Sequence, residues 1–173
     1  ESWGELDVVF ATRAGSVRRN KLSDFVQVNR NGKIAMKPDE GDGIVDVQIC
    51  TDEDDILLTT ANGQTIRFPV TDVRVFSGRT STGNRGINLG DGDSVIGMGV
   101  LRHVEVTPAE ARAYFKWDAS SRDASEEVEA DAEADDTGEV ADVPFEKLML
   151  MKTQEQFILT VASGGLGKRA SSY

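Results

Sequence analysis

The sequence predicts an all-β fold: a partial, propeller-like array of about two and a half blades, each made of four short strands. An internal repeat is the first observation behind this prediction, because residues 14–25 align with residues 62–73 without a gap. The second is a late third copy, which starts near Phe157 and ends with the chain. The third is the recurrence of turn glycines between short apolar runs, which is typical of hairpins.

Each repeat is expected to contain two hairpins. The first hairpin has its tight turn at residues 13–15 in one copy and at the Asn62-Gly63 turn in the next, and Asn-Gly favours the positive φ values of such turns. The second hairpin is expected across the glycine- and aspartate-rich turns 39–42 and 90–93. The expected strand pairs are 6–12 with 16–20, 33–37 with 44–49, 56–60 with 65–68, and 86–89 with 94–100. The alternative is a single β-sandwich with similar hairpins, but chance similarity does not explain the ungapped alignment of Arg19 with Arg67.

Four segments follow from the repeat. Residues 1–53 form the first blade repeat, 54–103 the second, 104–145 an acidic insert, and 146–173 the start of a third repeat. Thr107-Pro108-Ala109-Glu110 has the pattern of a capping box with proline in the first turn, which predicts a short helix over 108–117. The rest of the insert is rich in Glu, Asp and Ala and is expected to be mobile. It is either a solvated spacer or an imitation of DNA that occupies a basic surface.

Charge is distributed unevenly along the chain. The formal net charge is −11, but residues 104–145 hold 13 acidic and 3 basic residues, which leaves 17 acidic and 16 basic residues elsewhere. Outside the insert the chain is therefore nearly neutral, and the overall charge does not exclude a nucleic-acid partner. The single Cys50 and single His103 exclude an internal disulfide and a zinc module and suit a reducing cytoplasm. No apolar stretch is long enough to predict a membrane span.

Catalytic and metal-binding patterns are sparse. One histidine and one cysteine, far apart in sequence, offer little for nucleophilic catalysis. The acidic runs 52–55 and 90–93 lack the ligand spacing of a calcium loop and are interpreted as solvated loop and turn. We therefore expect no catalytic residues, no metal ligands and no cofactor in this chain.

Basic residues give the functional prediction. Arginine recurs at the same place in each repeat, and further Lys and Arg lie beside glycine-rich backbone. If these groups face the same way, they form a curved positive strip that contacts DNA phosphates without reading bases. Alternatively, they are scattered solubilising charges. The expected DNA-binding residues are Arg18, Arg19, Lys21, Arg30, Lys33, Arg67, Arg79, Arg85, Lys168 and Arg169.

The sequence strongly resembles the C-terminal domain of the DNA gyrase A subunit. The matching stretches are FATRAGSVRRNKLSDF, GKIAMKPDEGDGIVDV, DILLTTANGQTIRFPVTDVRVFSGRTSTGNRGINLGDGDSVIGM and FILTVASGGLGKR. The resemblance implies a partial β-pinwheel, an internal fragment of a domain that wraps duplex DNA to support ATP-dependent negative supercoiling. It also implies that ATP and Mg²⁺ act in other parts of a bacterial type II topoisomerase.

The resemblance further implies partners and a location. These are the gyrase B subunit together with the remainder of the gyrase A subunit, in a heterotetramer associated with the nucleoid in the bacterial cytoplasm. Two departures limit it: the family's glutamine-arginine-glycine box has at best a degenerate echo in Asn84-Arg85-Gly86, and neither Tyr114 nor Tyr173 lies in the context of the nucleophilic tyrosine. The open sheet edges of a partial ring predict self-association.

Three alternatives remain open. One is the corresponding subunit of topoisomerase IV, whose C-terminal domain is a close relative. Another is a propeller that binds proteins, in which the charges are incidental. The last is a propeller enzyme with central acidic residues, for which the sequence offers no convergent pair.

Overall fold

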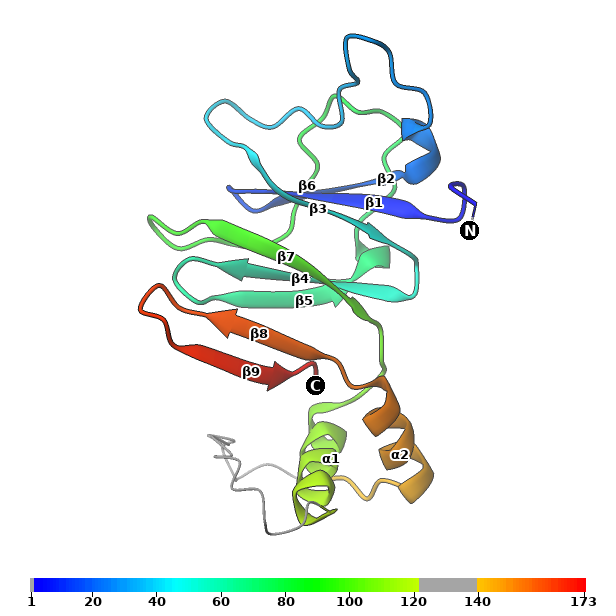
Figure 1. The fold of residues 1–173 in the computed structure, drawn as a ribbon, viewed down its shortest axis with the longest axis vertical. Helices are drawn as coiled ribbons and strands as arrows, with labels where there is room; N and C mark the ends of the chain where they lie inside the picture. Colours follow the sequence, from blue (N-terminus) through cyan, green and yellow to red (C-terminus); the bar gives the residue numbers. More distant parts are fainter. Residues whose placement is uncertain (1, 122–139) are drawn as a thin grey trace. The chain divides into compact units, whose positions relative to one another are not determined.

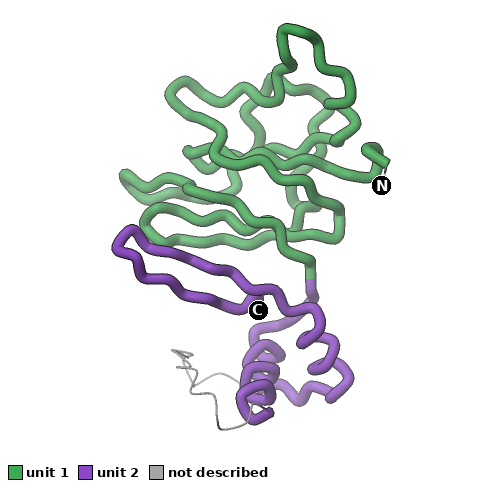
Figure 2. The backbone as a smooth tube through the Cα atoms, in the orientation of Figure 1, with its two compact units in different colours: residues 1–103 green, residues 104–173 purple. Residues whose placement is uncertain are grey.

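The computed structural model describes residues 2–121 and 140–173. The chain divides into two compact units, residues 1–103 and residues 104–173 (Figure 2). Most of the segment that we expected to be mobile lies outside the described residues.

Unit 1 contains a four-stranded sheet in the order β3-β1-β2-β6, with antiparallel pairing throughout (Figure 1). Its strands are β1 (Asp7–Thr12), β2 (Ser16–Lys21), β3 (Ile44–Cys50) and β6 (Asn84–Arg85). All six residues of β1 are buried, because this strand lies in the middle of the sheet with apolar packing on both faces. Such a strand shows a continuous apolar run and no alternation.

A second sheet in unit 1 has three strands in the order β5-β4-β7. They are β4 (Asp54–Thr60), β5 (Thr65–Pro69) and β7 (Val95–Arg102), and the short 3-10 helices Leu22–Phe25 and Val70–Asp72 follow β2 and β5. In both sheets the first strand of the repeat is central, and the second and last strands flank it. Even a register shift recurs, at Ala11/Thr12 and at Thr59/Thr60. The all-β, propeller-like repeat that the sequence predicts is therefore present.

The prediction of a second hairpin in each repeat is wrong. Strand β3 pairs with β1, and β7 pairs with β4, while residues 33–37 and 86–89 form no strand. The glycine-aspartate turns do form, but their carboxylates stabilise the other hairpin. Asp42 Oδ1 accepts a hydrogen bond from Ala14 N at 2.9 Å, and Asp93 Oδ1 accepts one from Asn62 N at 3.0 Å. Desolvation opposes the charge of Asp42, but hydrogen bonds from Thr12, Ala14 and Gly43 outweigh it and lower the pKa of this carboxyl.

Strand β6 links the two repeats, because it follows the second hairpin in sequence and pairs with β2 of the first (Ser16 with Arg85). Two glycines permit this approach. A Cβ at Gly83, whose φ is +97°, would lie 2.3 Å from the carbonyl oxygen of Val17, and a Cβ at Gly86 would lie 2.7 Å from the Val17 side chain. The glycines beside Arg85 therefore serve backbone packing, where we had expected room for a phosphate.

The main core of unit 1 lies between its two sheets. Val9, Val17 and Cys50 from one sheet pack with Ile56, Leu58, Val95 and Met98 from the other. A smaller core covers the opposite face of β1, where Val8 and Phe10 pack with Met36. Met36 is thus buried by loop packing, outside any strand.

Unit 2 contains α1 (Pro108–Ser121), α2 (Phe145–Gln154) and the hairpin of β8 (Phe157–Val161) with β9 (Gly167–Ser171). The predicted capping box is present, since Thr107 N donates to Glu110 Oε2 at 2.9 Å and Glu110 N donates to Thr107 Oγ1 at 3.3 Å. Helix α1 continues to Ser121, beyond the predicted end at Trp117. Helix α2 was missed, and it lies where the third repeat was expected to begin.

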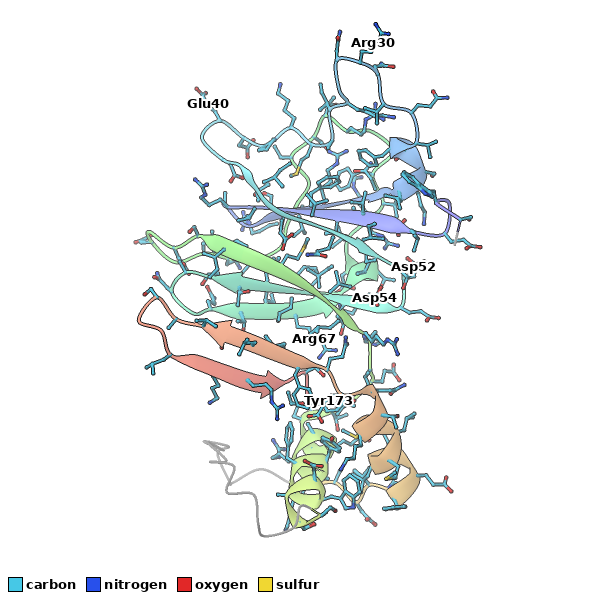
Figure 3. The ribbon with its side chains drawn as sticks, in the orientation of Figure 1. Arg30, Glu40, Asp52, Asp54, Arg67 and Tyr173 are labelled. Atoms are coloured by element: carbon cyan, nitrogen blue, oxygen red, sulfur yellow. The ribbon has the colours of Figure 1, made fainter. Side chains whose placement is uncertain are left out.

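The two helices of unit 2 share a small aromatic core. Tyr114, Leu148 and Met151 are buried, and Tyr173 packs edge-on against Tyr114 with ring centroids 5.5 Å apart. Figure 3 shows Tyr173 beside the helices, and its hydroxyl donates to Met151 O at 2.8 Å. Burial, together with the hydrogen bond to Glu155, raises the pKa of Tyr114. None of the helices among the described residues has the length and apolarity to cross a membrane.

Candidate nucleic-acid interface

The recurring arginines of the first two repeats are engaged inside the fold. Arg19 is 4% exposed, and its Nε donates to Asp7 Oδ2 at 2.7 Å. Its guanidinium also pairs with Asp52 and donates to Val70 O at 3.2 Å, so it joins the first repeat to the 3-10 helix of the second. Contrary to the prediction, Arg19 does not face outward toward DNA.

Arg67 repeats this arrangement in the second repeat. Its Nε donates to Asp55 Oδ2 at 2.7 Å, and its Nη2 donates to Arg102 O at 3.1 Å. The other oxygen of Asp55 lies 2.8 Å from His103 Nδ1. Figure 3 shows Arg67 on β5 and the Asp52–Asp54 turn that leads into β4. The sequence separation between arginine and aspartate is the same in both repeats, so their recurrence reflects a structural pair.

The third repeat lacks the acidic partner. Phe157 stands at the position that the aspartate holds in the other two repeats, and the Arg169 guanidinium lies 4.5 Å from the centre of the Phe157 ring. Arg169 and Lys168 are both exposed. Within the described part of the chain neither has a carboxylate at ion-pair distance, so both remain candidates for phosphate contact.

Arg18 is fully buried and takes no part in an outward strip either. Because side chains alternate along a strand, Arg18 and Asn20 point to the face of β2 opposite Val17 and Arg19. There Arg18 Nε donates to Asn20 Oδ1 at 2.8 Å, and its Nη1 donates to Ser81 Oγ at 2.8 Å. Asn20 Nδ2 donates to Phe76 O at 2.7 Å. These bonds fasten the 76–81 segment over the sheet.

Three arginines lie near one another beside this segment, and we call them the arginine cluster: Arg18, Arg74 and Arg79. The guanidinium carbons of Arg18 and Arg74 lie 4.8 Å and 4.2 Å from the centre of the Phe76 ring. Burial, with the nearby charges of Arg74 and Arg79, lowers the pKa of Arg18. Among the described residues none of the three has a carboxylate partner. Arg74 was absent from the predicted site residues, since nothing in the repeat alignment marked it.

One further predicted residue, Lys33, lies beside a member of this cluster. Lys33 and Arg79 line one pocket of about 380 Å³, and Arg79 Nη1 donates to Asp24 O at 3.2 Å. Arg30 is exposed near the tip of the loop that carries Lys33 (Figure 3). The structure thus brings Lys33 and Arg79 together, and the charge of Arg79 acts on Arg18.

The remaining predicted residues are placed separately. Lys21 is half-exposed and pairs with Asp7 Oδ1 at 2.8 Å. Arg85 is exposed on β6, where its Nη1 donates to Asn88 Oδ1 at 3.2 Å. The exposed cations Arg13, Lys37 and Lys116 were not predicted as site residues.

The acidic and sulfur-containing groups do not converge on a site. Across residues 2–121 and 140–173, no cluster of His, Cys, Asp and Glu is arranged to hold a metal ion. Burial, with the charge of Asp7 nearby, raises the pKa of the Cys50 thiol to about 12, so this group stays protonated near neutral pH. The Asp52–Asp55 run supplies partners for Arg19, Thr51 and Arg67.

Both sheets have the first strand of their repeat at the centre, and β6 links the two repeats. This arrangement defines a domain of repeated β-blades. The chain belongs to the family described as "DNA gyrase C-terminal domain, beta-propeller", which matches residues 6–51 and 54–102. This match covers more than half of the chain.

Relatives agree with this family, and solved structures agree with its fold. The chain is 45% identical to the DNA gyrase A subunit of Granulibacter bethesdensis over 99% of its own length, which is 19% of that relative. It therefore spans about a fifth of the length of this relative. A gyrase A C-terminal domain structure aligns with a TM-score of 0.51 at 21% identity, covering 57% of this chain and 32% of that one. The C-terminal domain of a DNA topoisomerase IV aligns with a TM-score of 0.54 at 23% identity, covering 57% and 31%.

Proposed function

We propose that this chain binds and wraps duplex DNA without sequence specificity as part of DNA gyrase, and so supports ATP-dependent negative supercoiling. The observation that carries the proposal is the arginine cluster, whose three guanidinium groups have no carboxylate partner among the described residues. Unpaired cations beside an exposed surface suit phosphates of the DNA backbone, which supply most non-specific affinity. Membership of the gyrase family supports the same partner.

The contacts we propose differ from the full predicted set. Arg19 and Arg67 hold the fold together, and Lys21 is engaged by Asp7. Arg18 is buried, so it attracts DNA phosphates through its charge and does not contact them. The direct phosphate contacts that remain are Arg30, Lys33, Arg74, Arg79, Arg85, Lys168 and Arg169.

The chemistry of supercoiling belongs to other parts of the assembly. We propose that the gyrase B subunit and the remainder of the gyrase A polypeptide supply strand passage, ATP and Mg²⁺ in a heterotetramer, and that this chain needs no cofactor of its own. The matched region is 19% of the Granulibacter bethesdensis relative, in keeping with this division. The proposed location is the bacterial cytoplasm, at the nucleoid. A role in topoisomerase IV has weaker support, because the topoisomerase IV structure matches at 23% identity and shows the fold alone.

Few blades give few phosphate contacts. Bending a site of 20–30 base pairs costs on the order of 1–6 kcal/mol, which several contacts must offset together. We therefore expect weak binding by this chain alone. Strands β3 and β5 are outermost in their sheets, and we propose that such edges pair with neighbouring blades or with a second copy.

A salt titration of duplex binding tests the proposal. Each phosphate contact contributes about −0.9 to the slope of log affinity against log salt concentration, so we expect a steep slope that is the same for duplexes of unrelated sequence. Arg74→Ala, which removes an exposed guanidinium, should make the slope shallower by about one. Lys116→Ala on α1 removes the same charge from unit 2 and serves as the control. An affinity that stays flat from low to moderate salt would contradict DNA binding and favour a protein partner.

A further inference from the structure

Beside the arginine cluster, two loops of unit 1 line an open pocket of about 380 Å³. One loop supplies Gln27, Asn29 and Lys33, and the other supplies Arg79 and Thr80. The first loop is internally fastened, since Lys33 Nζ donates to Gln27 O at 2.8 Å and Gly32 N donates to Asn29 O at 2.9 Å. The pocket is thus built by local hydrogen bonds, and its two cations come from segments far apart in sequence.

The lining is positive and rich in donors. It includes an ammonium, a guanidinium, two side-chain amides and a hydroxyl, and no acidic side chain. Only Ile34 adds a large apolar surface, and the lining holds no aromatic ring on which a base could stack. The lining therefore suits an oxyanion better than a nucleobase.

Arg79 adds an unsatisfied donor. Its Nη1 reaches Asp24 O, but its Nε is buried and has no hydrogen-bond partner. A buried donor on a charged group is costly to leave unpaired, and an oxyanion is the acceptor that a guanidinium fork matches best. Arg18 lies near enough for the charges of Arg74 and Arg79 to lower its pKa, and these three positive charges add to the attraction for an anion.

We propose that this pocket holds one phosphate group between Lys33 and Arg79. The inference rests on the proposed function where the phosphate belongs to duplex DNA. The same chemistry would also accept free inorganic phosphate. A backbone phosphodiester held here would fix the position of the duplex on the chain, because phosphate contacts set register and orientation.

The first experiment titrates inorganic phosphate into the ¹⁵N-labelled chain at constant ionic strength and follows the Arg79 Nε–Hε signal by NMR. We expect a saturable shift in Arg79 and in the Gly32 and Thr80 amides. Lys33→Gln should weaken phosphate binding by about tenfold. Lys37→Gln is the matched control, since it removes an exposed lysine in the same segment but outside the pocket. Equal effects of the two variants would overturn the proposal.

The second arm adds a duplex of about 30 base pairs in place of phosphate, long enough for a bent site. If the duplex shifts the same Arg79 signal and inorganic phosphate competes with it, the occupant is a DNA phosphate. If phosphate saturates the pocket while bound duplex leaves the signal unchanged, the occupant is the free anion. If neither ligand shifts Arg79, the pocket proposal fails, and salt-dependent duplex binding measured in the same samples would leave the proposed function standing. Arg79→Lys, which keeps the charge and loses the fork, should weaken phosphate binding while the fold stays intact.

Discussion

At the scale of single residues, an ion pair explains why arginine recurs at the same place in the first two repeats. Arg19 and Arg67 align because each closes a diagonal pair with an aspartate on the neighbouring strand, Asp7 or Asp55. The sequence does contain a signal of this, since Asp55 follows Asp7 at the same interval at which Arg67 follows Arg19. The recurrence of arginine alone predicts a DNA contact. The joint recurrence of arginine and aspartate on the two strands of one hairpin predicts an ion pair.

Removal of Asp7 should expose the cost of this burial. We expect Asp7→Ala to lower the free energy of unfolding by about 3–5 kcal/mol, because among the described residues it leaves the buried Arg19 guanidinium with only the exposed Asp52 as an acidic partner. Urea denaturation measures the change. Arg30→Ala, on an exposed loop, is the control and should stay within about 0.5 kcal/mol. An unchanged unfolding midpoint for Asp7→Ala, combined with weaker DNA binding by Arg19→Ala, would restore the original DNA-contact interpretation.

At the scale of elements, local chemistry was predictable and long-range pairing was not. The hairpin turns at Gly15, Gly63 and Gly165 all have positive φ, as the turn sequences indicate. Residues 33–37, expected to be a strand, form a loop that packs Met36 against Phe10. A short apolar run does not reveal which element covers it, and the same ambiguity hid α2, where Leu148 and Met151 face the core of unit 2.

The candidate site was predictable only in part, for the same reason. Lys33 and Arg79 were recognised as basic residues near glycines, but they are far apart in sequence, and only the folded chain shows that they line one pocket. Arg18 and Arg19 are adjacent in sequence and point to opposite faces of β2. Whether each is buried depends on the 76–81 segment and the 3-10 helix of the next repeat, which sequence periodicity in β2 does not encode.

The exchanged strand β6 gives a prediction at this scale. Gly83→Ala should lower the free energy of unfolding by more than about 1 kcal/mol, because the residue has φ of +97° and its Cβ would overlap the carbonyl group of Val17. The variant should also speed hydrogen exchange of the Ser16 and Val17 amides beside β6. Gly41→Ala is a useful comparison, since Gly41 also has positive φ but lies in open space. Equal losses in the two variants would show that the left-handed conformation alone, without the close approach to β2, sets the cost.

At the scale of the whole chain, the distribution of charge and the edge strands of the sheets bear on DNA binding and on self-association. The acidic residues concentrate in 104–145, so the net charge of −11 does not describe the surface that carries the arginine cluster. The main core and the smaller core on the other face of β1 both lie within residues 1–103. The blades of unit 1 nevertheless leave unpaired strand edges, and an exposed edge is a template for another strand.

These edges predict concentration-dependent association of the isolated chain. Strand β5 is outermost in its sheet, and among the described strands it pairs only with β4. Ile66 on β5 is 37% exposed. Sedimentation velocity should therefore show dimers or larger species as the concentration rises, and Ile66→Lys should shift the distribution toward monomer, because lysine on an edge strand opposes pairing. Thr71→Lys, at an exposed position just beyond β5 in the 3-10 helix, adds the same charge off the edge and should leave association unchanged. A chain that remains monomeric at high concentration would mean that its own loops already protect the edges.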